Sequence, residues 1–580
     1  MTIRKALLLP LLLVIVSRLN CSFVASVIVV VDRELTRISY NDLRDLFGDT
    51  DMDGDEDKDG DGDDNDDQKL LIAILQQQRR MIAPLLLKIE EAFGTTVVKE
   101  QEVRNNNEEE KGNAVLDVLP SLGFLEITDL PSEMVQLRKK LLPKASKLAN
   151  LPLDELSALE RPESGYSIGW SHGRESFRDG DFDADVDNDG DGDGDGDGDG
   201  DGDVEGHGGG ESKRLYDTAK GSFYMNPFIV DTTNNGNNEN KDENKDKNDN
   251  GAAVVNVYPP SLQPQLEEDL LKMTKCMSRV GLWIAVLCDL YLHNNHDDHS
   301  QEQECAFKDR NDDEDDDEDD DCDAEFYPNL SSSSFTTNQW MVYKSLKSGR
   351  PAAKARLLYY FPPGGQRQQE KEKIQTKNDE NDQVVFDDWC GWHTDHGSLT
   401  ALLPGMLCDE EEEEENEKIM SSSSSSSSSH PKPGLYIKTK TLNSVASDTT
   451  DSNIEDIQQQ QQQPQEQLVH VNLASTSFGF QLGETLQIMS KGKFTATPHA
   501  VKAPPTDANN AAVGRSSLAV FLQPLASQAL PPLMTMDKID QENDHGDDRK
   551  QNNDYDNFSL QRRWRSTFGE FQRVTVESFS

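Results

Sequence analysis

Short apolar runs separated by turn-forming residues fill the second half of the chain, from about residue 353 onward. Most carry β-branched or aromatic residues and often lie near Gly, Pro or Asn, which is typical of strands joined by turns. Such a series indicates an antiparallel sandwich or barrel, of which a jelly roll is one form. The predicted strands are 355–361, 435–440, 468–473, 485–490, 494–501 and 517–522.

The first half shows helical spacing instead. Over residues 265–292, apolar residues recur every three or four positions, which predicts a long helix with one apolar face packed in the core. A second helix is predicted over 131–142 and should end at Pro143. The β-branched run 27–31 suits a buried strand. The chain is therefore expected to be mainly β with flanking helices, in the α+β class, with a helical N-terminal region.

Four acidic tracts interrupt the chain between the predicted helices and strands. The 580 residues carry a net charge of -51, of which four acidic tracts hold -47, so the rest of the chain is nearly neutral. Tracts of this composition cannot bury enough apolar surface to offset the entropy of ordering, and we predict disordered insertions in loops. The acidic total gives no indication of nucleic-acid binding. The acidic tracts are 49–67, 179–205, 297–325 and 409–419, and further low-complexity runs lie at 234–251, 421–429 and 443–467.

The N-terminus has the layout of a signal peptide. Arg4 and Lys5 precede a mostly apolar run at 6–16, and several small residues follow up to Ser26. The run is shorter than the roughly 20 apolar residues of a membrane span, so no integral span is predicted. The alternative is a hydrophobic N-terminus that stays in the mature protein. The signal peptide would target the protein to the secretory pathway or an organelle, whereas the alternative fits a cytoplasmic location. The seven cysteines form no CxxC and indicate neither a disulfide framework nor a zinc module.

Candidate metal ligands lie in the segment WCGWHTDHGSLT at 389–400. If this segment is a strand, His393 and Asp395 point to the same side, because alternate residues share a face. An imidazole and a carboxylate so placed are two-thirds of the 2-His-1-carboxylate triad, which holds Fe(II) and leaves coordination positions open. The third ligand must come from a distant strand, and His499 is the candidate.

Taken with the later Arg515-x-Ser517, this pattern resembles the isopenicillin-N-synthase-like branch of the Fe(II)/2-oxoglutarate-dependent oxygenases. HTDHGSLTALL at 393–403 is close to the family's HTDxGxLTLL. The histidines are 106 positions apart, about twice the family's usual interval, and removing the low-complexity stretches 409–432 and 444–467 leaves 58. Further similar segments are 480–488 (the strand pair before the distal histidine), 519–524 (the closing strand), and 119–130, 165–173 and 220–227 in the N-terminal region.

The resemblance implies a double-stranded β-helix, or jelly roll, that binds Fe(II), 2-oxoglutarate and O2. It implies hydroxylation or desaturation of a small organic substrate with release of succinate and CO2, and no catalytic residue beyond the metal centre. Arg515 and Ser517 would bind the far carboxylate of 2-oxoglutarate. Tyr360 lies where relatives carry a tyrosine near the co-substrate, although a plain strand aromatic fits as well. The implied parts are a targeting segment at 1–26, an N-terminal region at 27–350, the oxygenase domain at 351–527 and a C-terminal segment at 528–580.

Two alternatives stay open. An iron oxidase that uses only O2 would share the fold, since Arg-x-Ser also serves substrate carboxylates within this family. A non-catalytic acidic protein would bind divalent cations weakly through its tracts, but the loop at 55–66 departs from an EF-hand at Gly62 and Asp66. His396 is expected in a loop beside the metal, and His470 on a strand face without one.

Overall fold

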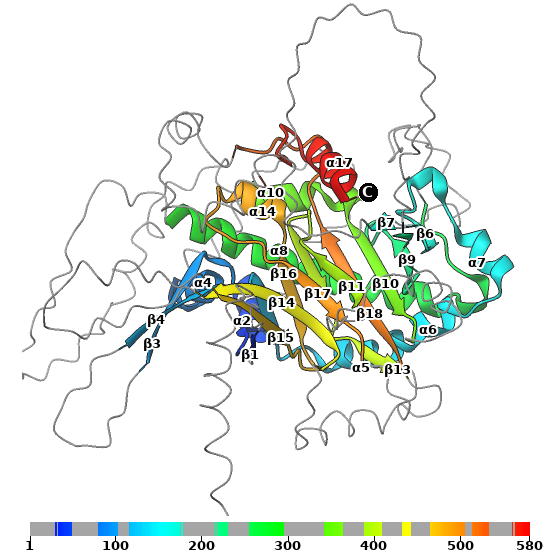
Figure 1. Ribbon diagram of the computed structural model, residues 1–580, viewed down its shortest axis with the longest axis horizontal. Helices are drawn as coiled ribbons and strands as arrows, with labels where there is room; N and C mark the ends of the chain where they lie inside the picture. The colour runs from blue at the N-terminus through cyan, green and yellow to red at the C-terminus, as the bar shows by residue number, and fades with distance from the viewer. Residues whose placement is uncertain are drawn as a thin grey trace, which may run out of the picture.

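The protein is described by a computed structural model in which two β-sheets and a group of helices form the folded part (Figure 1). The structure describes the following residues, and counts and absences refer to these residues alone. These are 29–31, 33–48, 79–101, 115–174, 176–177, 215–216, 218–229, 255–294, 341–362, 388–408, 432–441, 465–504, 513–532, 560 and 563–579.

The larger sheet joins strands from both halves of the chain. Its strands are antiparallel neighbours except β2 and β5, which run parallel. In spatial order they are β2 (Thr36–Ser39), β5 (Phe124–Thr128), β16 (Phe478–Leu482), β12 (Leu399–Leu402), β18 (Gly514–Leu522), β10 (Lys354–Tyr360), β9 (Lys220–Met225) and β6 (Gly169–His172), with β13 (Met406–Cys408) also beside β18.

The smaller sheet carries the candidate metal ligands. In spatial order its strands are β1 (Val29–Val31), β15 (Gln465–Val471), β14 (Gly434–Thr441), β17 (His499–Lys502) and β11 (Asp388–His393). Two separate hairpin-like pairs are β3 (Thr96–Gln101) with β4 (Val115–Pro120), and β7 (Ser176–Phe177) with β8 (Leu215–Tyr216).

Helices come from every part of the described chain. The α-helices are α2 (Tyr40–Phe47), α4 (Arg79–Phe93), α5 (Ser132–Leu141), α6 (Pro143–Ala149), α7 (Leu153–Leu159), α8 (Gln265–Asn294), α10 (Met341–Ser348), α14 (Glu484–Met489) and α17 (Phe568–Phe579). Single 3₁₀ turns lie at Pro162–Ser164, Pro260–Leu262 and Arg350–Ala352. Pro143 ends the predicted second helix and at once begins α6, because proline is well tolerated in the first turn of a helix.

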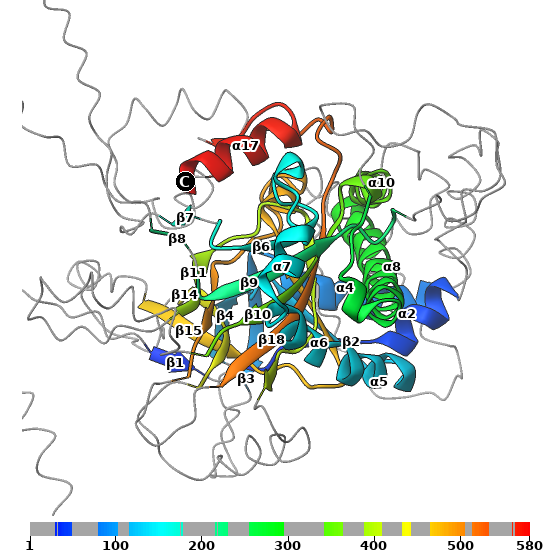
Figure 2. The same ribbon diagram turned by 90° about the vertical axis from the view of Figure 1, so that its right-hand side faces the viewer.

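The molecule is layered, with the smaller sheet on one side, the larger sheet in the middle and most of the helices on the other side (Figure 2). Two apolar clusters connect the two sheets: one includes Phe124 and Ile437, and the other includes Leu358 and Trp389. A much larger cluster lies between the larger sheet and the helices. The sheets therefore pack as a sandwich, and the helices cover its outer face.

The long helix α8 is the centre of this helical layer. Its predicted apolar stripe is buried in full, as the sequence pattern indicated. By length and composition Gln265–His293 could cross a membrane, yet 78% of the qualifying window is buried inside the protein. Gly281 allows α8 to lie against β18, because any side chain there would overlap Leu522. The stripe consists of Leu266, Leu270, Met273, Met277, Val280, Ile284, Leu287 and Tyr291.

Two predicted strands are wrong in whole or in part. Of residues 485–490, all but Ser490 lie in helix α14, whose six residues are all buried, so the helix shows no exposed face that would reveal its period. Only the end of 494–501 is a strand: β17 begins at His499, directly after Pro498, which has no N–H to donate to a ladder. The similarity of 480–488 to a strand pair therefore holds only for β16.

Several predictions concern segments that the structure does not describe. The targeting segment 1–26, the four acidic tracts, the Asn/Lys, Ser and Gln runs, and the loop at 55–66 lie outside the described residues, apart from a few positions at the ends of some runs. Their predicted disorder and cation association therefore stay predictions.

A buried carboxylate joins α8 to α10 and permits a test of this packing. Asp289 accepts hydrogen bonds from the N–H groups of Val342 (2.9 Å) and Tyr343 (2.8 Å) at the start of α10. Burial raises the pKa of Asp289 to about 7, although these N–H groups act in the opposite direction. The carboxyl group is thus harder to ionise in the folded chain than in the unfolded one.

We expect Asp289→Ala to lower the free energy of unfolding by about 1–3 kcal/mol near pH 4, because it leaves buried N–H groups without an acceptor. The loss should shrink as the pH rises to about 7, because the wild-type carboxyl group is then ionised in the unfolded chain and must take up a proton as the chain folds. Urea unfolding at several pH values measures both effects, with exposed Glu268→Ala on the same helix as the control. A loss that grows with pH would contradict the raised pKa.

Candidate metal centre

The two histidines face each other across neighbouring strands of the smaller sheet. β11 and β17 are antiparallel, and His393 at the end of β11 is the register partner of His499 at the start of β17. Their ring centroids are 4.4 Å apart. His499 is buried and His393 is half-buried, and both line one cavity.

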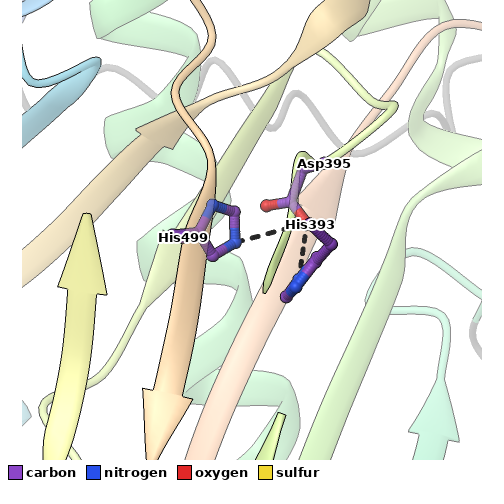
Figure 3. Close-up of side chains that lie close together, drawn as sticks. All are labelled: His393, Asp395 and His499. Carbon is purple, nitrogen blue, oxygen red and sulfur yellow. Dashed lines mark ion pairs between the residues drawn. The ribbon is translucent and has the colours of Figure 1, made fainter. Parts of the chain in front are cut away.

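Asp395 completes the group from a loop. Figure 3 shows its carboxylate between the two imidazoles, and its Oδ1 lies 3.9 Å from Nε2 of His393 and 3.9 Å from Nε2 of His499. One donor atom from each of the three residues lies within 4.8 Å of the others. The expectation that Asp395 belongs to the same strand as His393 is wrong, because β11 ends at His393. The loop after the strand nevertheless brings the carboxylate to the imidazoles.

Hydrogen bonds orient all three side chains toward a common point. His393 Nδ1 lies 2.8 Å from the Gly391 carbonyl oxygen, and His499 Nδ1 lies 3.2 Å from that of Thr497. Because a carbonyl oxygen only accepts, Nδ1 carries a hydrogen in each ring, and Nε2 is the nitrogen left to bind a metal. The Thr400 hydroxyl donates to Asp395 Oδ2 at 2.6 Å and leaves Oδ1 available.

The protonation of the group also suits a divalent cation. Burial alone would raise the pKa of Asp395, but the imidazoles of His499 and His393 and the Thr400 hydroxyl lower it. Burial, assisted by His393, lowers the pKa of His499 to about 4. Burial also lowers the pKa of His393, but Cys390 and Asp395 outweigh it and raise this pKa to about 9. A metal would therefore find a carboxylate and one neutral imidazole, and would displace a proton from the other imidazole.

The candidate co-substrate residues line the same cavity as the three metal-ligand candidates. Arg515 and Ser517 are two residues apart on β18 and share a face of the strand. Arg515 is the register partner of Tyr360 on β10, and its guanidinium carbon lies 5.4 Å from the centroid of the tyrosine ring. The cavity thus has a carboxylate-imidazole group on one wall and a guanidinium, a phenol and a hydroxyl on another.

The loop beside Arg515 fits closely around its guanidinium. A Cβ atom at Gly405 would overlap that group, so only glycine leaves room for it. Buried Arg138 also holds this loop. It donates through Nε (3.0 Å) and Nη2 (2.8 Å) to the Pro404 carbonyl oxygen, and Nη2 also donates to the Gly405 carbonyl oxygen (3.2 Å). Neither residue is predicted by the sequence, because no local motif marks this contact.

His396 and His470 lie outside the group of three ligand candidates. His396 lies in the loop after Asp395, where its ring faces away to Gln572 of α17, 2.9 Å between side-chain nitrogens. His470 lies on β15, packs against Tyr436 and lines the same cavity. The structure groups neither residue with the three ligand candidates.

Comparisons with known proteins add similarities of low identity. No model of a known protein family matches the chain, and no curated protein matches it. Among solved structures, a full-length Neurospora crassa protein in complex with alpha-KG shows 12% identity and a TM-score of 0.40, covering 94% of this chain and 96% of that one. The dioxygenase for auxin oxidation in rice shows 13% identity and a TM-score of 0.34, covering 94% and 96%. JOX2 in complex with 2OG, Fe and JA shows 12% identity and a TM-score of 0.34, covering 72% of each chain.

Proposed function

We propose that the protein is an Fe(II)- and 2-oxoglutarate-dependent oxygenase that oxidises a small organic substrate. One observation carries this proposal: His393, Asp395 and His499 form a metal-binding group in a cavity that Arg515 also lines. Two imidazoles and one carboxylate are the donor set of non-haem Fe(II) oxygenases, with coordination positions left for other ligands. A guanidinium in the same cavity suits the far carboxylate of a dicarboxylic co-substrate.

We also propose that the core is a jelly roll of the isopenicillin-N-synthase-like branch: the strand order supports the jelly roll, and the motif HTDHGSLTALL at 393–403 supports the branch. From β10 onward, and leaving aside the short strand β13, the chain places β10, β12, β16 and β18 in the larger sheet and β11, β14, β15 and β17 in the smaller one. The chain thus changes sheet at almost every step, as expected of strands wound into a double-stranded β-helix. The metal-ligand candidates then lie at one end of the smaller sheet, facing the interior between the sheets.

In the proposed mechanism the protein binds, orients and shields the reactants. Iron with 2-oxoglutarate and O2 supplies the oxidative chemistry when bound. His393, Asp395 and His499 hold the metal through atoms that their hydrogen bonds have already oriented. Arg515 forms paired hydrogen bonds to the far carboxylate, Ser517 adds a hydroxyl, and the Tyr360 ring packs against the guanidinium. Apolar side chains such as Leu358 and Val501 also line the cavity and would limit the access of water to the bound reactants.

The proposal is tested by co-substrate turnover. Purified protein with Fe(II), 2-oxoglutarate and O2 should release succinate and CO2 slowly even without its substrate, and His499→Ala protein should not. Mass spectrometry measures succinate, and radiolabelled 2-oxoglutarate measures CO2. A wild-type protein that binds Fe(II) but neither binds nor consumes 2-oxoglutarate would favour the O2-only oxidase, and one that binds no Fe(II) in the cavity would favour the acidic cation-binding alternative.

A further inference from the structure

The loop that carries Asp395 is held by a buried carboxylate outside the metal-ligand candidates. Glu484, the first residue of α14, is buried, and its Oε1 accepts a hydrogen bond from the Thr394 hydroxyl at 2.6 Å. The backbone N–H of Glu484 donates to the Asp395 carbonyl oxygen at 2.8 Å, and the Thr485 hydroxyl donates to that of His396 at 2.5 Å. The start of α14 therefore contacts the chain before, at and after the ligand candidate.

The C-terminal segment, residues 563–579, contacts both Glu484 and the loop that carries Asp395. Arg563 donates to both oxygens of Glu484, through Nη2 to Oε1 at 2.7 Å and through Nη1 to Oε2 at 2.9 Å. This is a bidentate ion pair with both side chains largely buried, at 18% and 6% exposed. In addition, the Gln572 side chain lies 2.9 Å from His396 Nε2, and Phe568 stacks on the same imidazole.

We propose that the C-terminal segment is a positioning element for the metal centre, acting on Asp395 through Arg563–Glu484–Thr394 and through Gln572–His396. Both neighbours of Asp395 are held by contacts that lead to this segment, while Thr400 fixes the carboxylate itself. The orientation of Asp395 Oδ1 between the two imidazoles thus depends on whether residues 563–579 are docked. Replacing residues that hydrogen-bond to metal ligands commonly lowers metal affinity by roughly 10–100-fold.

Arg563 is predicted to hold the Glu484 carboxylate in place, in addition to any stabilisation of the fold. Removing it leaves Glu484 buried without its cation, so the carboxylate should turn toward water and release Thr394. A lysine would restore the charge but not the two parallel hydrogen bonds, because an ammonium group lacks the planar fork. The metal site of Arg563→Lys should therefore lie between those of wild-type and Arg563→Met proteins.

The inference rests on the proposed metal site but not on 2-oxoglutarate, and its test uses the full chain with Co(II) under nitrogen. Chelator competition gives the affinity, and the visible d–d absorption of Co(II) reports the geometry of its ligands. Arg563→Met should weaken Co(II) about 10–100-fold and shift the absorption, with Arg563→Lys in between. Arg573→Met, which changes an exposed arginine on α17 in the same C-terminal segment, should match wild type.

A second pair of variants covers the case in which Arg563→Met fails to fold. Thr394→Val and Gln572→Leu each remove one polar contact to the loop, and both should weaken Co(II) in the same direction. Folded variants with wild-type affinity and absorption would overturn the inference while leaving the metal site intact. A wild-type protein that binds no Co(II) at this site would instead overturn the proposed function on which the inference rests.

Discussion

Replacing Asp395 with alanine is expected to abolish stoichiometric binding of Fe(II) and, with it, all turnover. The carboxylate is the only anionic member of the three-residue group, and its Oδ1 lies between the two imidazoles. Without it, two histidines would hold the cation with one donor fewer and no compensating negative charge. Anaerobic titration with Fe(II), read by metal analysis after desalting, measures the loss.

Two further variants separate a lost ligand from a disturbed one. Thr400→Val keeps the carboxylate but removes the hydroxyl that donates to Oδ2, so its metal affinity should fall by roughly 10–100-fold without disappearing. Asp154→Ala, an exposed aspartate on α7, should bind iron like wild type. An Asp395→Ala protein that retained one tightly bound Fe(II) would rule out the ligand assignment.

The second large effect is expected at Arg515. Arg515→Ala should leave iron bound but weaken 2-oxoglutarate by about 1.5–3 kcal/mol, the usual strength of hydrogen bonds to charged groups. That is roughly a 10–150-fold rise in the dissociation constant. Arg515→Lys should recover only part of the affinity, because a single ammonium cannot form the paired bonds of a guanidinium. Isothermal titration of the Fe(II) protein under nitrogen measures these constants.

Gly405→Ala offers an independent approach to the same contact. The added methyl group would overlap the Arg515 guanidinium and displace it without changing any charged group. The variant should lose affinity for 2-oxoglutarate in the same direction as Arg515→Ala and keep its iron. If both variants bind 2-oxoglutarate like wild type, the co-substrate carboxylate does not bind at Arg515, and the O2-only oxidase gains support.

Local patterns were sufficient for much of the fold. The apolar stripe of α8 is visible because a helix with one buried face repeats every three or four residues. Strands β10, β14, β15 and β18 were predicted within a few residues, because each is short and bounded by turn or low-complexity residues. α14 was missed because a six-residue helix buried on every side shows no exposed polar face, and the alternation of polar and apolar residues over Thr485, Leu486, Gln487 and Ile488 fits a strand equally well.

The sequence by itself also determined which residues could form the metal group, since the residue types and their order identify His393, Asp395 and His499 as candidates. Only the tertiary structure decided what holds them. Thr394 and Glu484 are 90 positions apart, Glu484 and Arg563 are 79 apart, and His396 and Gln572 are 176 apart. No local pattern predicts such pairs, because each partner is a common polar residue whose role arises from where the packed sheets and helices place it.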